Sequence, residues 1–406
     1  MAWVINTLVV AHRGEPVLVD ARVARAQDLA VRFEGRFSVV PRVYRAPGRV
    51  NLIGEHTDYN EGYVLPAAIG LFCHIAAAPR DDRRIVVESE DIGRRVEWSL
   101  DEADPTPRAA WSHYVLGVAA LLRRRDHHLR GATLLVSSHV PMGSGLSSSA
   151  ALEVAAATAL ADISGLSIES GELARLCQQA EIDFVGARCG IMDQFVATHA
   201  RADHALLLDC RSLDHRHVPL LPGVRLVVCN TMVRHSHAGG AYNLRRAECE
   251  SGVARISARF PEVKSLRDVD EARLYACRAD LPDTVFKRCR HVVSENGRVR
   301  AFVSALERAQ AAALGAAMAD SHRSLRDDYE VSCAELDAMV DVAQDAPGML
   351  GTRMTGGGFG GCTVSLVQED LVDDFRAHVG ERYAARISRA PDIHVMDAGD
   401  RAMRVL

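Results

Sequence analysis

The stretch from Val140 to Ala161 constrains the fold of this 406-residue chain more than any other. Its first half, residues 141–149, consists mainly of small residues, with two glycines and three consecutive serines whose backbone amides can approach a ligand. Its second half, residues 150–161, is rich in alanine and leucine, which favour a helix. A glycine- and serine-rich loop that leads into a helix presents free N–H groups and the positive end of the helix dipole. The stretch therefore predicts an anion site, with phosphate as its commonest ligand, in preference to a serine-capped structural helix.

The lysine content excludes one large class of phosphate-binding protein. Among 48 basic residues only Lys264 and Lys287 are lysines, and neither follows a glycine. A Walker A loop requires Gly-Lys-Ser or Gly-Lys-Thr, so the chain is not a P-loop NTPase. A phosphate loop without lysine must take its positive charge from a metal ion, from arginine and from the helix end.

Length and composition indicate an ordinary globular protein of two domains. We place the boundary at residues 219–224, with an extension at 1–20, an N-terminal domain at 21–220 and a C-terminal domain at 221–406. The net charge of −5 gives no electrostatic case for nucleic acid or an anionic membrane. The apolar run at 3–10 is too short for a membrane span and lacks the features of a signal peptide.

Cysteine and histidine spacing predicts neither a disulfide framework nor a metal site. The ten cysteines are scattered without a C-x-x-C pair, which is typical of reduced thiols in a cytoplasmic protein. The close histidines at 127–128 and at 235 and 237 have no second ligand pair nearby. We interpret them as structural or solvated side chains.

Periodicity predicts alternating helices and strands in the first half and long helices in the second. Helices are expected at 21–33, 111–124, 150–161, 168–185, 284–318 and 333–345. Strands are expected at 37–44, 72–78, 84–88, 132–140, 205–209 and 224–230.

Two segments carry polar side chains in unusual surroundings. The glycine-rich segment 45–69 contains Arg49, Glu55, His56 and Asp58, which suits either a site for sugar hydroxyls or a solvated acidic turn; the residues alone leave both open. Asp193 stands among apolar neighbours at 191–196. A carboxylate there needs a partner, either as a structural hydrogen bond or as an acid or base with a chemical task.

The glycine run at 356–361 matches the dinucleotide pattern G-x-G-x-x-G only formally. That pattern must lead into a helix, whereas residues 362–367 alternate and are β-branched, so the glycines precede a strand. The glycines indicate close backbone approach to a ligand or another segment. Protein-kinase motifs are absent from the sequence as well.

Four motifs together resemble the galactokinases, a branch of the GHMP family of small-molecule kinases. They are R-A-P-G-R-V-N-L-I-G-E-H-T-D-Y-N from Arg45, P-M-G-S-G-L-S-S-S-A-A from Pro141, C-G-I-M-D-Q-F from Cys189 and M-T-G-G-G-F-G-G-C from Met354. The first resembles a motif specific to galactokinases, the motifs from Pro141 and from Met354 are shared with the wider family, and C-G-I-M-D-Q-F resembles the catalytic segment. The match covers residues 45–367. Ser144, and the residues Gly239-Gly240-Ala241 before Tyr242, depart slightly from the pattern.

The resemblance implies a role for each matching position. The sugar site would include Arg49, Glu55, His56, Thr57, Asp58, Gly190, Asp193 and Tyr242. The ATP site would include Ser89, Trp111, Gly143, Ser144, Gly145, Leu146, Ser147, Ser148 and Ser149. Ser149 and Glu181 would hold Mg²⁺. Asp193 would take the proton of the anomeric hydroxyl with Arg49 beside it, whether as a base or chiefly through its charge.

The fold implied by the resemblance is α+β. An N-terminal domain like the second domain of ribosomal protein S5 would join a C-terminal ferredoxin-like domain, with the active site between them. The implied activity is ATP-dependent phosphorylation of the C1 hydroxyl of galactose, the entry step of the Leloir pathway, by a monomer. Two alternatives remain: a kinase for a related sugar such as N-acetylgalactosamine or a uronic acid, and a galactose or ATP sensor without catalysis.

Overall fold

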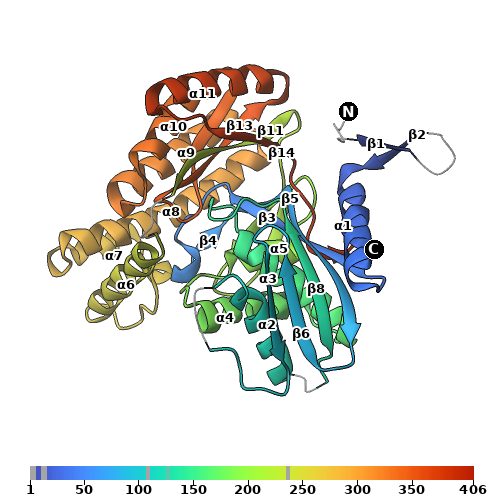
Figure 1. The fold of residues 1–406 in the computed structure, drawn as a ribbon. Coiled ribbons are helices and arrows are strands. Elements are labelled where there is room, and N and C mark those ends of the chain that lie inside the picture. The colour runs from blue at the N-terminus through green and yellow to red at the C-terminus, as the bar shows by residue number, and fades with distance from the viewer. Residues whose placement is uncertain (1–5, 11–15, 107–109, 126–127, 235–237) are drawn as a thin grey trace.

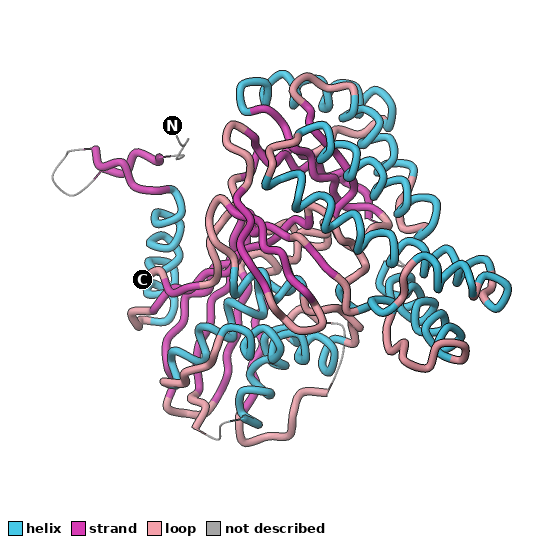
Figure 2. Tube along the Cα trace, turned by 180° about the vertical axis from the view of Figure 1, so that it is seen from behind, coloured by secondary structure: helices cyan, strands magenta, loops and turns pink. Residues whose placement is uncertain are grey.

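The computed structural model describes the chain apart from residues 1–5, 11–15, 107–109, 126–127 and 235–237 (Figure 1). Two bodies of secondary structure meet along the middle of the molecule, each built on a β-sheet with helices packed against it (Figures 1 and 2). The α+β class expected from the sequence is therefore confirmed. The histidines at 127, 235 and 237 lie outside the described residues.

The first body is a six-stranded sheet in the order β15-β3-β5-β8-β6-β7. Its strands are β3 (Arg42–Asn51), β5 (Pro66–Arg80), β6 (Arg84–Ser89), β7 (Arg94–Ser99), β8 (Gly131–Ser138) and β15 (Met403–Arg404). The helices of this half are α1 (Ala21–Phe37), α2 (His113–Arg125), α3 (Ser148–Ser164), α4 (Ser170–Ala180) and α5 (Met192–His199). A small sheet of β4 (Tyr63–Val64), β9 (His204–Asp209) and β10 (His215–Pro219) completes it.

Alternation along the strands explains why both faces of the large sheet are covered. Val43 and Ala76 pack with Phe33 of α1 on one face, while Tyr44 and Ile75 belong to the main core on the other face. Successive side chains of a strand point to opposite faces, so both sets are apolar. The helix α3 supplies much of the main core with alanines, which let it lie close to the sheet.

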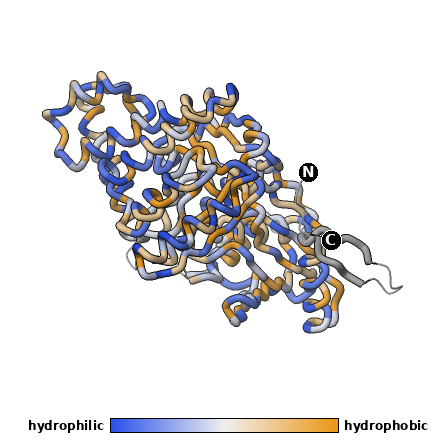
Figure 3. The backbone as a smooth tube through the Cα atoms, turned by 90° about the horizontal axis from the view of Figure 1, so that it is seen from above, coloured by the Kyte–Doolittle hydropathy of each residue, from blue (hydrophilic) through white to orange (hydrophobic). Residues whose placement is uncertain are grey.

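The second body is a four-stranded antiparallel sheet in the order β12-β13-β11-β14. Its strands are β11 (Val224–Arg234), β12 (Met349–Thr355), β13 (Gly360–Gln368) and β14 (Asp392–Met396). The helices are α6 (Ala238–Ser257), α7 (Glu271–Ala276), α8 (Asp283–Glu307), α9 (Ala311–Ser324), α10 (Ala334–Gln344) and α11 (Val372–Ile387). Viewed from above, apolar positions gather toward the inner elements and hydrophilic positions mark outer turns (Figure 3).

The structure corrects the start of the chain as read from sequence. The first helix continues to Phe37, and the next strand begins only at Arg42 and runs to Asn51. The segment around Arg49, which we expected to be a loop, is therefore partly strand. A β-bulge between Pro47 and Arg49 lets the strand continue past Pro47-Gly48.

Other differences concern elements that short sequence windows do not specify. The helix expected at 284–318 is two helices, because Ala309 adopts a left-handed backbone with φ of 53° between α8 and α9. The strands β7, β10, β14 and β15 and the helices α6 and α11 were not foreseen. Their patterns are short or strongly charged, and pairing or packing with distant segments decides their structure.

Both ends of the chain form strand pairs that the sequence analysis did not predict. Within the expected N-terminal extension, β1 (Asn6–Val10) and β2 (Pro16–Asp20) pair as antiparallel strands that stand away from the rest of the molecule (Figure 2). At the other end β15 pairs with β3, so the C-terminus returns to the first sheet. The domain boundary at 219–224 remains a prediction.

Two further findings concern the described residues alone. None of their helices is both long and apolar enough to cross a membrane. All ten cysteines are free thiols, as the sequence predicted.

Candidate functional site

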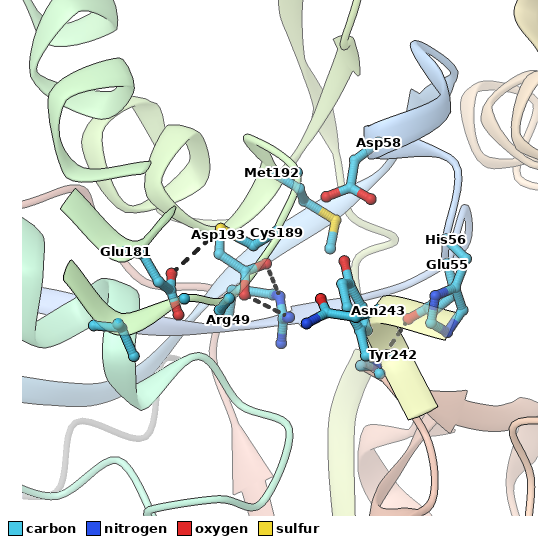
Figure 4. A pocket seen from close by; sticks show the side chains of 16 residues that line it. Arg49, Glu55, His56, Asp58, Glu181, Cys189, Met192, Asp193, Tyr242 and Asn243 are labelled. Carbon is cyan, nitrogen blue, oxygen red and sulfur yellow. Dashed lines mark hydrogen bonds and ion pairs between the residues drawn. The ribbon is translucent and has the colours of Figure 1, made fainter. Parts of the chain in front are cut away.

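A cavity of about 470 Å³ opens between the two bodies, and the predicted sugar-binding side chains line it (Figure 4). Segments far apart in sequence contribute to it: the end of β3, the 3-10 turn after it, the start of α5, the start of α6 and the turn after β12. Its lining residues include Arg49, Glu55, His56, Asp58, Glu181, Gly190, Asp193 and Tyr242 as predicted, together with Cys189, Met192, Asn243, Gly356 and Gly357.

Arg49 and Asp193 form the charged centre of this cavity. Arg49 Nε and one terminal nitrogen donate to the two carboxylate oxygens of Asp193, each at 2.8 Å. The hydroxyl of Ser147 donates to the same carboxylate, and Arg49 also donates to the backbone oxygen of Gly145. Because Asp193 lies in the first turn of α5, the helix dipole also favours its negative charge. The predicted adjacency of Arg49 and Asp193 is confirmed.

Glu55 is held by a residue that the sequence did not single out. One carboxylate oxygen of Glu55 contacts Arg353 of β12, and the other accepts the backbone N–H of Gly356 at 3.0 Å. Arg353 is fully buried and Glu55 nearly so. Burial raises the pKa of Glu55 to about 7, while the guanidinium of Arg353 opposes that rise. Glu55 therefore connects the predicted sugar-binding segment to the second body.

His56 belongs to a chain of hydrogen bonds that also crosses between the two bodies. Its Nδ1 lies 2.9 Å from the hydroxyl of Tyr59, which lies 2.7 Å from the hydroxyl of Tyr329, itself 3.2 Å from the thiol of Cys249. Burial lowers the pKa of His56 well below its usual value, and the His56 ring is therefore neutral. This series of hydrogen bonds fixes the orientation of the His56 ring. Tyr329 was not foreseen, because it lies 270 residues from its partner.

Asp58 and Gly190 lie against each other in the cavity wall. A Cβ atom at position 190 would be 1.9 Å from a carboxylate oxygen of Asp58, so only glycine fits there. Burial, followed by the nearby charge of Asp193, raises the pKa of Asp58 to about 6. Thr57 behaves differently: it is buried, and its hydroxyl is directed at the carbonyls of Gly54 and Tyr63 instead of lining the cavity.

Glu181 lies where the cavity approaches the phosphate loop. The helix α4 passes into a π-helical turn, Glu181–Val185, that begins at this residue; such turns are frequent at functional sites. Burial raises the pKa of Glu181 to about 7, the negative charge of Asp193 adds to the rise, and hydrogen bonds from Cys189, Ser149 and Gln194 oppose it. Ser149 and Glu181, the two predicted Mg²⁺ ligands, therefore lie near each other, and their role in metal binding remains a prediction.

A second cavity, of about 210 Å³, lies wholly within the first body. It contains five predicted nucleotide residues: Ser89, Trp111, Gly143, Ser148 and Ser149. Residues that the sequence did not single out complete it, namely Cys73, Asp91, Ile92, Tyr114, Val136, Ser138, Met142 and Leu152. Most of the lining is apolar or aromatic, which is the environment that a flat nucleobase requires.

The rest of the predicted phosphate loop supports this cavity without lining it. Ser144 is buried and its hydroxyl donates to Pro141, while Leu146 is part of the main core. The loop is compact because Gly143, Gly145 and Ser147 all have positive φ. The helix α3 begins at Ser148, so Ser148 and Ser149 occupy its first turn. A helix N-terminus therefore faces the cavity, as the sequence predicted.

The glycine-rich turn between β12 and β13 packs against this loop. A Cβ atom on Gly361 would be 2.6 Å from the carbonyl oxygen of Ser144, and one on Gly356 would be 2.7 Å from that of Gly145. The close backbone approach predicted from the glycines is confirmed, and their connection to a strand excludes the dinucleotide motif. The same turn contacts both Glu55 and the phosphate loop.

Comparisons with known proteins agree with this arrangement. Three family models match: the galactokinase galactose-binding signature over residues 31–79, the GHMP kinases N terminal domain over 113–201 and the GHMP kinases C terminal over 302–385. A galactokinase of Roseiflexus sp. is 47% identical over 93% of this chain and 97% of its own length. One of Chloroflexus aggregans is 49% identical over 90% of this chain and 94% of its own.

Solved structures show the same fold. The crystal structure of Lactococcus lactis galactokinase complexed with galactose has a TM-score of 0.89 and 35% identity, covering 93% of this chain and 99% of that one. Methanococcus jannaschii mevalonate kinase, at 18% identity and a TM-score of 0.63 over 89% of this chain and 99% of its own, shares the fold alone. The expected two-domain kinase fold is therefore confirmed.

Proposed function

This chain belongs to the galactokinases of the GHMP kinase family, and on that premise we propose that it transfers the terminal phosphoryl group of ATP to the C1 hydroxyl of galactose. The observation that carries the proposal is the pair of adjoining cavities. One, which we call the polar cavity because five charged side chains line it, contains the Arg49–Asp193 ion pair; the other is largely apolar and ends at the N-terminus of α3. Glu181 lines the first cavity and Ser149 the second, and Ser149 lies close enough to Glu181 to lower the pKa of its carboxyl group, so the two cavities adjoin there.

Galactose would be held in the polar cavity by charged and neutral groups together. Asp58 and Glu55 supply acceptors for sugar hydroxyls, and neutral His56 supplies a ring whose orientation the tyrosine chain fixes. Tyr242 and Asn243 close the opposite wall from the start of α6 (Figure 4). Buried groups that require a hydroxyl partner reject analogues that lack it, which suits selection among sugars.

In the reaction, the C1 oxygen forms a bond to the terminal phosphorus as the bond from that phosphorus to the bridging oxygen of ADP breaks. We propose that Asp193 orients the hydroxyl by accepting its hydrogen and receives the proton as the new bond forms. The carboxylate already accepts three hydrogen bonds from Arg49 and Ser147, which stabilise its anionic form. Its contribution before bond formation is therefore positioning and charge, as expected for a reaction with a loose transition state.

The residues next to the phosphate loop fit Mg²⁺. Ser149 and Glu181 provide a hydroxyl and a carboxylate oxygen side by side, which is the hard oxygen donor set that this ion prefers. Among the described residues, no group of three or more His, Cys, Asp or Glu side chains could hold a metal ion. We infer that Ser149 and Glu181 would hold Mg²⁺, which would neutralise phosphate charge.

The sugar is tested with a panel. Purified protein is assayed with MgATP and galactose, N-acetylgalactosamine, galacturonic acid and glucose, each at several concentrations. We expect kcat/KM for galactose to exceed that for each other sugar by at least about tenfold, because buried acceptors select hydroxyls strongly. A higher kcat/KM for another sugar would replace galactose as substrate. Binding of sugar and ATP without turnover would indicate a sensor.

A further inference from the structure

The carboxylate of Glu181 is held by a buried side chain outside the predicted site. Gln194 lies on α5, directly after Asp193, and is fully buried. Its amide nitrogen donates to Glu181 Oε2 at 2.7 Å and to Glu153 Oε2 at 2.9 Å. Glu153 lies on α3, five residues after Ser148 at the helix start, and is also fully buried. Three helical segments that form the site are therefore joined through one amide group.

The chemistry of the two neighbours determines which way this amide points. A carboxamide has an accepting oxygen and a donating nitrogen of nearly the same shape. Both partners of Gln194 are carboxylate oxygens, which accept hydrogen bonds. With both carboxyl groups ionised, a reversed amide would place its oxygen against two acceptors, so the observed orientation is the one that satisfies both contacts. Burial and the charge of Glu181 raise the pKa of Glu153, and the hydrogen bond from Gln194 opposes that rise. The nitrogen has two hydrogens, and each has one carboxylate partner.

The presence of Glu153 explains why the amide of Gln194 takes that orientation. With Glu181 as the only partner, one hydrogen of the amide would have no acceptor in a region without solvent. With Glu153 present, both hydrogens are used and reversal of the amide loses two hydrogen bonds. Leaving a buried hydrogen-bonding group without its partner costs about 1–3 kcal/mol.

The same contacts restrict the carboxylate of Glu181. Its Oε2 accepts from Gln194 at 2.7 Å and lies 3.5 Å from the thiol of Cys189. Both donors lie on the segment that carries Asp193. The group that we propose as a metal ligand is thus fixed relative to the group that contacts the sugar hydroxyl.

From these contacts we propose that Gln194 is a positioning residue that orients Glu181 toward the metal and nucleotide, and that Glu153 fixes the amide of Gln194 for this task. This inference rests on the proposed metal-binding role of Ser149 and Glu181. Partners that orient a metal ligand typically change metal affinity or activity by about 10–100-fold when they are removed. Neither Gln194 nor Glu153 needs to touch substrate.

Gln194→Met tests the proposal because methionine keeps the length and burial of the side chain and removes the donor. Mn²⁺ is titrated, with detection by electron paramagnetic resonance, into protein saturated with a non-hydrolysable ATP analogue and galactose. We expect the dissociation constant of Mn²⁺ to rise about tenfold or more. The dissociation constant of galactose, measured without nucleotide or metal, should stay within about twofold of wild type.

Gln179→Met is the matched control. Gln179 lies on α4 close to Glu181 and is exposed, and its amide donates to Asp183 at 2.6 Å instead of to a site residue. The same chemical change there should leave Mn²⁺ affinity unchanged. Loss of affinity in the control would show a general sensitivity of α4 and would overturn the specific role of Gln194.

Glu153→Met is the second variant, because methionine keeps the length of the side chain and has no oxygen to accept the amide hydrogen. This variant removes the acceptor that selects the amide orientation, and we expect Mn²⁺ affinity to fall several-fold. If Gln194→Met fails to fold, the Mn²⁺ affinity of this variant alone tests the proposal. Mn²⁺ affinities within twofold of wild type in the folded variants would overturn the inference. Wild-type protein that binds no Mn²⁺ with the nucleotide analogue would instead contradict the proposed metal site.

Discussion

The two proposed binding cavities of this protein are built in different ways. The proposed nucleotide cavity is lined by residues 73–152, all from the first body, and most of its wall is apolar. The proposed sugar cavity takes its residues from between 49 and 357, so both bodies contribute, and it concentrates charged groups. An apolar slot can form within one local fold. A polar cavity requires partners from elsewhere, because each partly buried charge must be balanced.

The effect of burying charge is seen in the pKa values of Glu55 and Asp58. The pKa values of both carboxyl groups are raised, to about 7 and about 6, with burial as the first cause in each case. Arg353 contacts Glu55 and limits the rise, whereas Asp58 faces the like charge of Asp193. The sugar cavity is thus the region whose function depends most on the assembled structure.

The largest effect is expected from Asp193→Ala, which removes the acceptor at the centre of the polar cavity. We expect kcat to fall about 10³-fold or more, since positioned acid–base groups typically contribute 10²–10⁴-fold. Binding of an ATP analogue, measured by calorimetry, should change little because Asp193 does not line the nucleotide cavity. Near-normal turnover would contradict the assigned role, and loss of nucleotide binding would mean that the two cavities are not separable.

Arg353→Met should have the next largest effect, this time on stability as well as sugar binding. Removal of one partner of a buried ion pair typically costs about 3–5 kcal/mol, and Arg353 and Glu55 are both buried. We expect a lower denaturation midpoint in urea and weaker galactose binding. Arg386→Met is the control, because Arg386 pairs with Asp341 at 3.0 Å and both side chains are 51% exposed. Equal losses in the two variants would show that burial of the pair is unimportant.

The pH dependence of galactose binding should distinguish the polar cavity from the apolar one. Glu55 and Asp58 accept sugar hydroxyls as anions, so affinity should be full above about pH 7 and fall as the pH drops through about 7 and about 6. The affinity for galactose is measured by calorimetry, without nucleotide, at pH values from 8 to 5. Asp58→Asn should bind more weakly but lose the lower transition; an unchanged profile in that variant would exclude Asp58 as the titrating group.

Asp58→Asn should also change the pH dependence of protein stability. The pKa of Asp58 in the folded protein, about 6, lies above its ordinary value of 3.8. The folded state therefore binds this proton more tightly than the unfolded state, and ionisation destabilises the fold as the pH rises through that interval. Asp58→Asn should be more stable than wild type at pH 8 and similar at pH 4, as measured by thermal denaturation.

The smallest effect is expected in the apolar cavity. Trp111→Ala should raise KM for ATP several-fold, since an aromatic contact contributes about 0.5–1.5 kcal/mol beyond its buried area. KM for galactose should stay the same, and Trp111→Phe, which keeps a ring, should recover most of the ATP affinity. A matching rise in KM for galactose would show that the two cavities are less independent than their lining residues indicate.

Local sequence determined the phosphate loop and helix start of the nucleotide cavity, although most of the side chains in its wall were not singled out. The loop at 141–149 and the helix after it are adjacent in the chain, and the absence of a lysine after glycine excluded the P-loop class. The motif around Asp193 and the segment at 49–58 identified the main polar groups of the other cavity. Fold class, family and these side chains were therefore accessible without coordinates, because each depends on a short continuous pattern.

Tertiary structure alone decided how those groups are held. Arg353 lies about 300 residues from Glu55, Tyr329 lies 270 from Tyr59, and Gln194 joins Glu153 to Glu181 across three helical segments. Arg353, Tyr329 and Glu153 were not singled out by a local pattern, and Gln194 lies in the motif from Cys189 but was given no role there. Thr57, which was given a role, bonds to the backbone. Hydrogen bonds and ion pairs act over a few ångströms in space, whatever the separation in sequence. Their partners are therefore determined only when the chain has folded.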